Sequence, residues 1–128
     1  MNIPSDIKYT QEHEWVRVEG DTVTVGITDY AQGELGDIVF VELPAEGSAT
    51  EKMAACGSIE AVKAVSDLFA PVTGEVLEVN SQLETDPQLV NKDPYGEGWM
   101  LKIKLANPDD LEVLLSADNY QKLIQGDS

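Results

Sequence analysis

The residue best suited to chemistry in this sequence is Lys63, which stands in the middle of an apolar and β-branched stretch, residues 57–76. The stretch is typical of two strands, and no strong turn former stands beside the lysine, so we place Lys63 at the tip of a hairpin. A hydrated primary amine on a rigid tip suits covalent modification. Solvated strand lysines are common, however, and the residue type alone leaves that ordinary interpretation open.

Other reactive side chains are scarce. With one histidine, His13, and one cysteine, Cys56, the sequence has no zinc site with two histidines and no CxxC pattern. It also lacks a Walker-type glycine loop and a GxSxG motif. In a strand, Glu12 and Glu14 would point away from His13, so we expect a partly exposed structural histidine. Cys56 lies among small residues and is expected to be buried and inert. The sequence therefore predicts no catalytic residues and no metal ligands.

Charge limits the choice of partners. The 128 residues include 24 acidic and 8 basic side chains, a formal net charge of -16 that is spread along the chain. Nucleic acid and anionic membrane surfaces are therefore poor partners, whereas basic faces of proteins are good ones. Solubility would explain the same composition. No signal peptide, transit segment or membrane span is visible, which predicts a cytoplasmic bacterial protein and leaves a processed organellar form as the alternative.

The rest of the sequence predicts a mainly β chain that forms one domain, residues 1–128. Residues 12–19 and 22–27, separated by Gly20-Asp21, predict a hairpin with one buried face. Thr28 and Asp29 are suited to cap a short helix that stops at Gly36. Further strands are expected in residues 36–44, 49–52 and 99–105, a single helical turn after Asp86, and two C-terminal helices in about 108–125.

Two segments of the sequence resemble each other. Residues 36–41 and 74–79 both read Gly, an acid, two apolar residues, a variable position and Val, and they lie on opposite sides of Lys63. An internal repeat of this kind predicts a sandwich with approximate two-fold symmetry around a central hairpin of about residues 54–79. Chance similarity between two strands is the alternative.

The surroundings of Lys63 resemble the lipoyl-attachment hairpin of lipoyl carrier proteins. Glu60 stands three residues before the lysine, Asp67 four residues after it, and Gly74 eleven residues after it. Biotin carriers flank their lysine with methionines, and here the neighbours are Val62 and Ala64. In detail the sequence is similar to the glycine cleavage system H protein family over residues 9–124. The matching segments include residues 13–16, 25–29, 36–44, 66–67, 74–76, 78–80 and 98–100.

This resemblance implies a barrel-sandwich hybrid of two antiparallel sheets, with a lipoyl-bearing hairpin, short helices and a C-terminal helical segment. It implies lipoate as a covalent cofactor, amide-linked to Lys63 by a lipoylating ligase or transferase. Glu60 and Gly74 would belong to the lipoylation motif of the hairpin. Ala61 stands where the family often has Ser, close enough to Lys63 to alter recognition by the lipoylating enzyme.

The resemblance also implies a cycle with three partners. The arm would take an aminomethyl group from glycine at the PLP-dependent glycine decarboxylase (P protein) and yield one carbon to tetrahydrofolate at the aminomethyltransferase (T protein). Dihydrolipoyl dehydrogenase (L protein) would then reoxidise it. In the family the loaded arm folds into a cleft, and Glu14 matches the acid of that cleft. We hypothesise that Glu14, supported by Asp67, holds the cargo amine.

Three other functions stay open at this point. A related carrier could serve another pathway, for instance as a lipoyl donor in lipoate relay. A biotinyl carrier would use the same hairpin. An acidic interaction module would need no cofactor.

Overall fold

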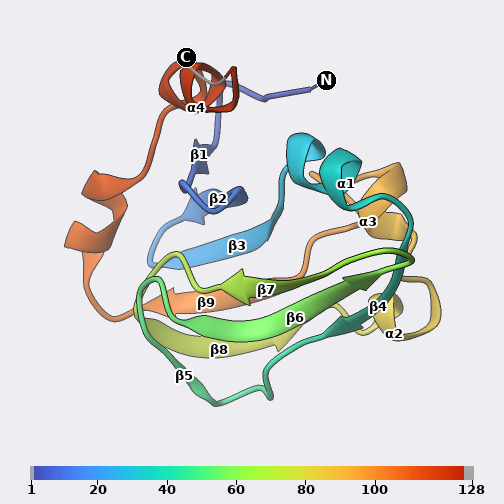
Figure 1. Ribbon diagram of the computed structural model, residues 1–128. Coiled ribbons are helices and arrows are strands. Elements are labelled where there is room, and N and C mark those ends of the chain that lie inside the picture. The colour runs from blue at the N-terminus through green and yellow to red at the C-terminus, as the bar shows by residue number, and fades with distance from the viewer. Residues whose placement is uncertain (1, 126–128) are drawn as a thin grey trace.

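The computed structural model describes residues 2–125, so Met1 and residues 126–128 of the expected domain lie outside the described part. Within that part the strands form two antiparallel sheets that face each other (Figure 1). Each sheet has two edge strands, so neither closes into a barrel. The expected pair of antiparallel sheets is confirmed. The larger sheet has the order β1 (Lys8–Tyr9), β2 (Glu14–Glu19), β3 (Thr22–Ile27), β9 (Leu101–Leu105), β8 (Gly74–Val79) and β5 (Ala49–Thr50), and the smaller has the order β4 (Ile38–Glu42), β6 (Ala55–Ala61) and β7 (Val65–Phe69).

An apolar core fills the space between the two sheets. Val25 and Ile103 reach it from the larger sheet, and Ile59 and Leu68 from the smaller one, all of them fully buried. Alternation along β6 produces this arrangement, because Ile59 points inward while the next residue, Glu60, is exposed. Ile59, Ala61 and Leu68 therefore anchor the β6–β7 pair to the core, and Ala61 does so next to the turn.

The two similar segments fall in different sheets. Residues 38–41 lie in β4, which pairs with β6, whereas residues 74–79 form β8, which lies between β5 and β9. The hairpin itself pairs β6 with β7 and ends at Phe69. It is shorter than the expected 54–79, because after Ala70 the chain crosses to the larger sheet.

Helix α1 (Asp29–Leu35) follows its predicted signals. Thr28 Oγ1 accepts a hydrogen bond from the Ala31 N–H at 3.2 Å, and the helix ends at Gly36, whose φ of 85° suits glycine. The single helical turn predicted after Asp86 is present, with Gln88 and not Asp86 as its N-cap. Asp86 ends an unpredicted helix, α2 (Gln82–Thr85), and α3 (Leu89–Lys92) begins after Gln88. Each of these helices has four residues and buries one apolar side chain, so neither shows a helical period.

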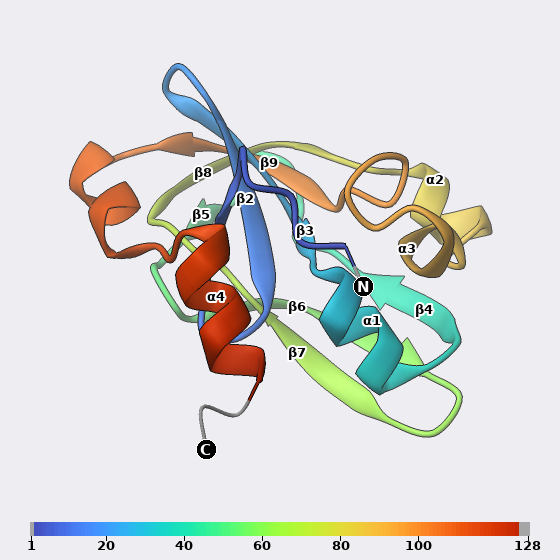
Figure 2. The same cartoon turned by 90° about the horizontal axis from the view of Figure 1, so that it is seen from above.

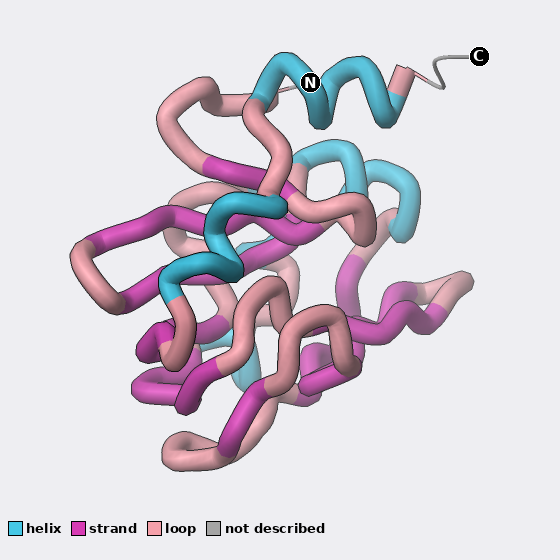
Figure 3. The backbone as a smooth tube through the Cα atoms, turned by 90° about the vertical axis from the view of Figure 1, so that its left-hand side faces the viewer, coloured by secondary structure: helices cyan, strands magenta, loops and turns pink. Residues whose placement is uncertain are grey.

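The C-terminal segment contains the two predicted helices, a 3-10 helix η1 (Pro108–Val113) and α4 (Ala117–Ile124), capped by Asn107 and Ser116. Helix α4 lies at the edge of the molecule beside β1 (Figures 1 and 3). Its fully buried Tyr120 stacks on Tyr9 with ring centroids 4.7 Å apart. Ile124 also packs there, but Leu123 stays 37% exposed, so the apolar face of α4 docks only in part.

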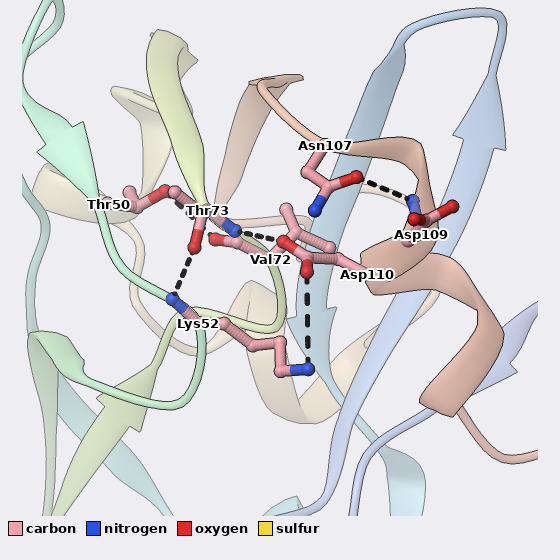
Figure 4. Close-up of polar contacts among 7 residues, drawn as sticks. All are labelled: Thr50, Lys52, Val72, Thr73, Asn107, Asp109 and Asp110. Atoms are coloured by element: carbon pink, nitrogen blue, oxygen red, sulfur yellow. Dashed lines mark hydrogen bonds and ion pairs between the residues drawn. The ribbon is translucent and has the colours of Figure 1, made fainter.

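A buried carboxylate fastens η1 to the sandwich (Figure 4). Asp110 Oδ2 accepts a hydrogen bond from the Thr73 N–H at 2.9 Å, and Oδ1 lies 4.0 Å from Lys52 Nζ. The Lys52 N–H in turn donates to Thr73 Oγ1 at 2.9 Å. This cluster joins the C-terminal segment to the turn that precedes β8. None of the helices in residues 2–125 has the length and apolar character needed to cross a membrane.

Candidate functional site

Lys63 stands in the short turn that joins β6 to β7, and its side chain is exposed. The Ala61 N–H donates to the Ala64 carbonyl oxygen at 2.7 Å and closes this turn. Val62 and Val65, on either side, are 72% and 69% exposed. Within residues 2–125 the Lys63 amine takes part in no ion pair. The amine is therefore accessible and, among the described residues, takes part in no ion pair at the tip of the hairpin.

The turn that carries Lys63 contacts the segment between α1 and β4. The Val62 N–H donates to the Asp37 carbonyl oxygen at 3.0 Å. A Cβ atom placed on Gly36 would lie 3.4 Å from Lys63 Cε, so the lysine stem passes close over this glycine. Asn91 holds the segment in place: its Oδ1 accepts from the Ile38 N–H at 2.8 Å, and its Nδ2 donates to the Gly36 carbonyl at 2.9 Å. No sequence signal assigned Asn91 this bracing role.

A cavity of about 250 Å³ lies between α1, the hairpin and the turn that precedes β2. Figure 2 shows α1 beside the hairpin at this position. Glu14 and Asp67, the two acids proposed to hold an amine, both line the cavity. Leu35 also lines it, and the next residue, Gly36, lies under the Lys63 side chain. A group attached to Lys63 would thus start at the rim of the cavity.

Glu14 is a buried acid, only 1% exposed. Its Oε1 accepts a hydrogen bond from the Thr10 hydroxyl at 2.6 Å, and its Oε2 accepts from the Phe69 N–H at 3.4 Å. Burial raises the pKa of Glu14 to about 8, although both hydrogen bonds act in the opposite direction. A cation that enters the cavity would favour the ionised carboxylate. The site is therefore better matched to an ammonium group than to a neutral or anionic one.

His13 does not lie in a strand with its two neighbouring acids pointing away from it, as the sequence suggested. It lies outside β2 with a φ of 73°, so the alternation of a strand does not apply, and His13 lines the same cavity as Glu12 and Glu14. Its Nδ1 lies 2.9 Å from the Tyr120 hydroxyl, which also hydrogen-bonds Thr28 Oγ1 at 2.7 Å. Burial lowers the pKa of His13. The histidine is partly exposed and joins α4 to the N-terminus of α1, which fits the structural role predicted for it.

The remaining predicted site residues lie outside the cavity. Glu60 is exposed on β6, opposite Val65. Gly74 lies in the other sheet, paired with Thr50 and Leu105, where a Cβ atom would come within 2.0 Å of the Lys104 carbonyl oxygen. Its place in the motif therefore has a packing reason. Cys56 is half-buried, and burial raises the pKa of its thiol to about 11, so it is a poor nucleophile.

The fold and the site together define a carrier: two antiparallel sheets present one exposed lysine at a hairpin tip, next to an acid-lined cavity. Residues 7–127 match the family described as Glycine cleavage H-protein. The chain belongs to this family, whose members are lipoyl carriers of the glycine cleavage system.

Individual relatives agree with this assignment. The glycine cleavage system H protein of Bacteroides fragilis is 59% identical over 124 residues, which cover 97% of this chain and 98% of that protein. That of Methylacidiphilum infernorum is 57% identical over 125 residues, covering 98% of each chain. The crystal structure of a glycine cleavage system H protein from Mycobacterium marinum is 40% identical, covers 97% of this chain and 99% of its own, and superimposes with a TM-score of 0.88.

Proposed function

We propose that this chain carries a lipoyl group on Lys63 and shuttles the aminomethyl group of glycine between the enzymes of the glycine cleavage system. The observation that carries the proposal is the exposed Lys63 side chain, which passes over Gly36 next to a cavity lined by Leu35 and by the buried acid Glu14. When bound, the lipoyl group would supply a dithiolane that accepts a carbon fragment and two electrons. The protein would supply presentation, shelter and partner recognition.

The proposed partners follow from that role. The carrier would be loaded at the glycine decarboxylase (P protein), unloaded at the aminomethyltransferase (T protein) and reoxidised at dihydrolipoyl dehydrogenase (L protein). A lipoylating ligase or transferase would acylate Lys63. Tethering raises the effective concentration of the cargo at each partner, because delivery becomes an intramolecular event once the carrier has docked. The core contacts under β6 and β7 keep the tip rigid while the attached group stays free to move.

Glu14 and Asp67 would hold the loaded group in the cavity. An ammonium group at about 4 Å from a carboxylate is attracted by up to about 4 kcal/mol at an effective dielectric constant near 20, before solvent and entropy reduce the net value. Burial of Glu14 limits that screening, whereas the exposed Asp67 adds a weaker attraction from the rim. The cargo amine would thus be kept away from water.

Intact-mass measurement on protein purified from its native host tests the attachment. We expect a lipoyl increment on the parent and none on Lys63→Arg. A biotin increment, or no increment on the parent, would contradict the proposal. Purified decarboxylase, transferase and glycine then separate glycine cleavage from a donor role in lipoate relay, because only a cleavage carrier supports turnover with these enzymes.

The holding role has its own test. Lipoylated Glu14→Ala protein, loaded with cargo, should release formaldehyde by hydrolysis faster than the parent, and Asp67→Asn should show a smaller increase. Equal rates for Glu14→Ala and the parent would show that the buried acid does not shelter the cargo.

A further inference from the structure

Thr10 closes the turn that carries Glu14. The backbone N–H groups of Glu12 and Glu14 both donate to Thr10 Oγ1, each at 3.2 Å. A threonine hydroxyl has one proton and two acceptor lone pairs. Because both lone pairs already accept, the hydroxyl proton is directed at Glu14 Oε1, 2.6 Å away. The direction of this hydrogen bond is therefore fixed by the backbone of the turn.

The carboxylate of Glu14 is held from two sides. Thr10 donates to one oxygen and the Phe69 N–H to the other, at 3.4 Å. Each carboxylate oxygen accepts about two hydrogen bonds, so each retains one free acceptor position. Glu14 lines the cavity, and both Glu14 and Thr10 are buried, with exposed fractions of 1% and 4%. The remaining acceptor positions are thus left for a group that binds in the cavity.

We propose that Thr10 is a positioning residue for the cargo amine, because its hydroxyl group aims the free acceptor positions of Glu14 into the cavity. The inference rests on the proposed holding role of Glu14. The Thr10 hydrogen bond also stabilises the ionised carboxyl group and so lowers the pKa of Glu14 against the effect of burial. Loss of the hydroxyl would leave Glu14 less well aimed and harder to ionise.

Other ionisable groups surround Glu14 and enter any pH profile. From the cavity wall these are Glu12 and His13 on the same turn, Tyr30 and Glu34 on α1, and Asp67 on β7. Cys56 on β6 and Tyr120 on α4 also interact electrostatically with Glu14. Thr10 is the side chain that donates a hydrogen bond to Glu14, and it does not itself titrate. A change at Thr10 therefore reports on Glu14 without removing a charge.

The test uses reduced, lipoylated protein loaded with formaldehyde and ammonium. Hydrolysis of the cargo consumes one water, breaks the bonds of the carbon to sulfur and nitrogen, and returns thiol, formaldehyde and ammonium without a redox change. Formaldehyde release gives the rate. Free reduced lipoamide, loaded in the same way, gives the rate without protein shelter.

Thr10→Val keeps the volume and removes the donor, whereas Thr10→Ser keeps the donor. We expect Thr10→Val to hydrolyse about threefold to tenfold faster than the parent, as the loss of one hydrogen bond to a charged group predicts. Thr10→Ser should restore slow hydrolysis. Protection needs ionised Glu14, so it is lost as the pH falls, and the midpoint of this loss should move to higher pH in Thr10→Val.

Thr50→Val is the matched control. Thr50 is also buried, and its hydroxyl donates to the Val72 carbonyl oxygen at 3.0 Å; both residues are drawn in Figure 4. This variant should lose comparable stability and keep the hydrolysis rate and pH midpoint of the parent. If Thr50→Val accelerates hydrolysis as much as Thr10→Val does, the Thr10 effect is general destabilisation and the inference is wrong.

The two proposals fail separately. If Glu14→Ala hydrolyses quickly and Thr10→Val behaves like the parent in rate and pH midpoint, only the role of Thr10 is overturned. If Glu14→Ala itself behaves like the parent, the holding role fails. Should Thr10→Val not fold, Thr10→Ala replaces it, and the Glu14 carboxyl is titrated by carbon-13 NMR in the unloaded protein. An unchanged titration would overturn the inference.

Discussion

Glu14 is kept buried at the expense of stability, and this is a sign of function at the residue scale. A glutamate in an unfolded chain titrates near pH 4.3, whereas burial raises the pKa of Glu14 in the folded protein to about 8. Between these two pH values the Glu14 carboxyl of the folded protein holds a proton that the same carboxyl has released in the unfolded chain. Raising the pH from 5 to 8 therefore lowers the free energy of unfolding of the empty carrier.

Glu14→Gln should remove this pH dependence. The variant has no proton to lose at this position, so its stability relative to the parent should rise between pH 5 and pH 8, by on the order of 2–4 kcal/mol. Urea denaturation at both pH values measures the difference. Glu60→Gln, which removes one exposed carboxylate, is the control. A difference between Glu14→Gln and the parent that is the same at pH 5 and pH 8 would mean that Glu14 is not protonated by its burial.

The residues proposed to carry the chemistry were visible in the sequence, but the residue proposed to position one of them was not. Lys63 stands out because a lone amine interrupts an apolar stretch, and Glu14 was found through a family resemblance. Thr10 has no such signal. The role proposed for Thr10 depends on a turn in which His13 adopts a φ of 73°, and that turn brings the hydroxyl at position 10 back to the carboxylate at position 14.

At the scale of elements, Gly74 shows why a motif residue need not touch a cofactor. It allows β8 to approach β9, where an added Cβ would collide with the Lys104 carbonyl oxygen. Gly74→Ala should therefore lower the free energy of unfolding by about 2 kcal/mol or more, since overpacking against backbone has no flexible side chain to absorb it. Chemical denaturation measures this loss.

Lipoylation of the same variant distinguishes packing from recognition. We expect the extent of lipoylation to follow the fraction of folded protein. The matched substitution Gly33→Ala, at a helical position with open space around it, should leave both quantities near those of the parent. Poor lipoylation of fully folded Gly74→Ala would instead assign the glycine a direct part in recognition.

The Asp110 cluster makes a second prediction at this scale. Asp110→Ala leaves the Thr73 N–H without its partner and should lower the free energy of unfolding by about 1–3 kcal/mol. Lys52 lies at 4.0 Å and is partly exposed, so Lys52→Met should change stability by less than about 1 kcal/mol. Urea denaturation compares the two. Hydrogen exchange at the Tyr9–Leu115 bridge should also increase in Asp110→Ala, because η1 directly precedes this contact. If the two substitutions lower the free energy of unfolding equally, the ion pair, and not the hydrogen bond to the backbone, fastens η1.

Element prediction succeeded where local signals agreed with the fold. Thr28 and Gly36 bound α1 as expected, and Asn107 and Ser116 cap the C-terminal helices. The central hairpin was predicted too long because residues 54–69 and 74–79 both have the residue pattern of strands. This pattern does not say which sheet a strand joins. Partner choice is set by long-range packing, as shown by β8, which pairs with β5 and β9.

At the scale of the whole molecule, charge is the dominant feature. The formal net charge is -16, and within residues 2–125 two ion pairs, Lys52–Asp110 and Lys102–Glu78, use basic side chains. Most acids are therefore uncompensated and sum to a negative field around the carrier. Such a field accelerates encounters with basic surfaces and is screened over about 8 Å at physiological salt.

Steering by this field predicts the salt dependence of docking to the glycine decarboxylase, the partner proposed to load the carrier. The association rate constant should fall by about tenfold between low and physiological salt, while the dissociation rate constant changes less, because long-range attraction acts before contact. Stopped-flow binding measures both. A variant with Glu19→Gln, Glu46→Gln and Glu112→Gln removes three exposed charges outside the hairpin and cavity, and it should associate more slowly at low salt if the summed field steers the encounter. The triple variant could instead keep the association rate constant of the parent, with the salt dependence lost only in Glu60→Gln. Contacts near Lys63 would then govern docking, and the remaining charge would serve solubility.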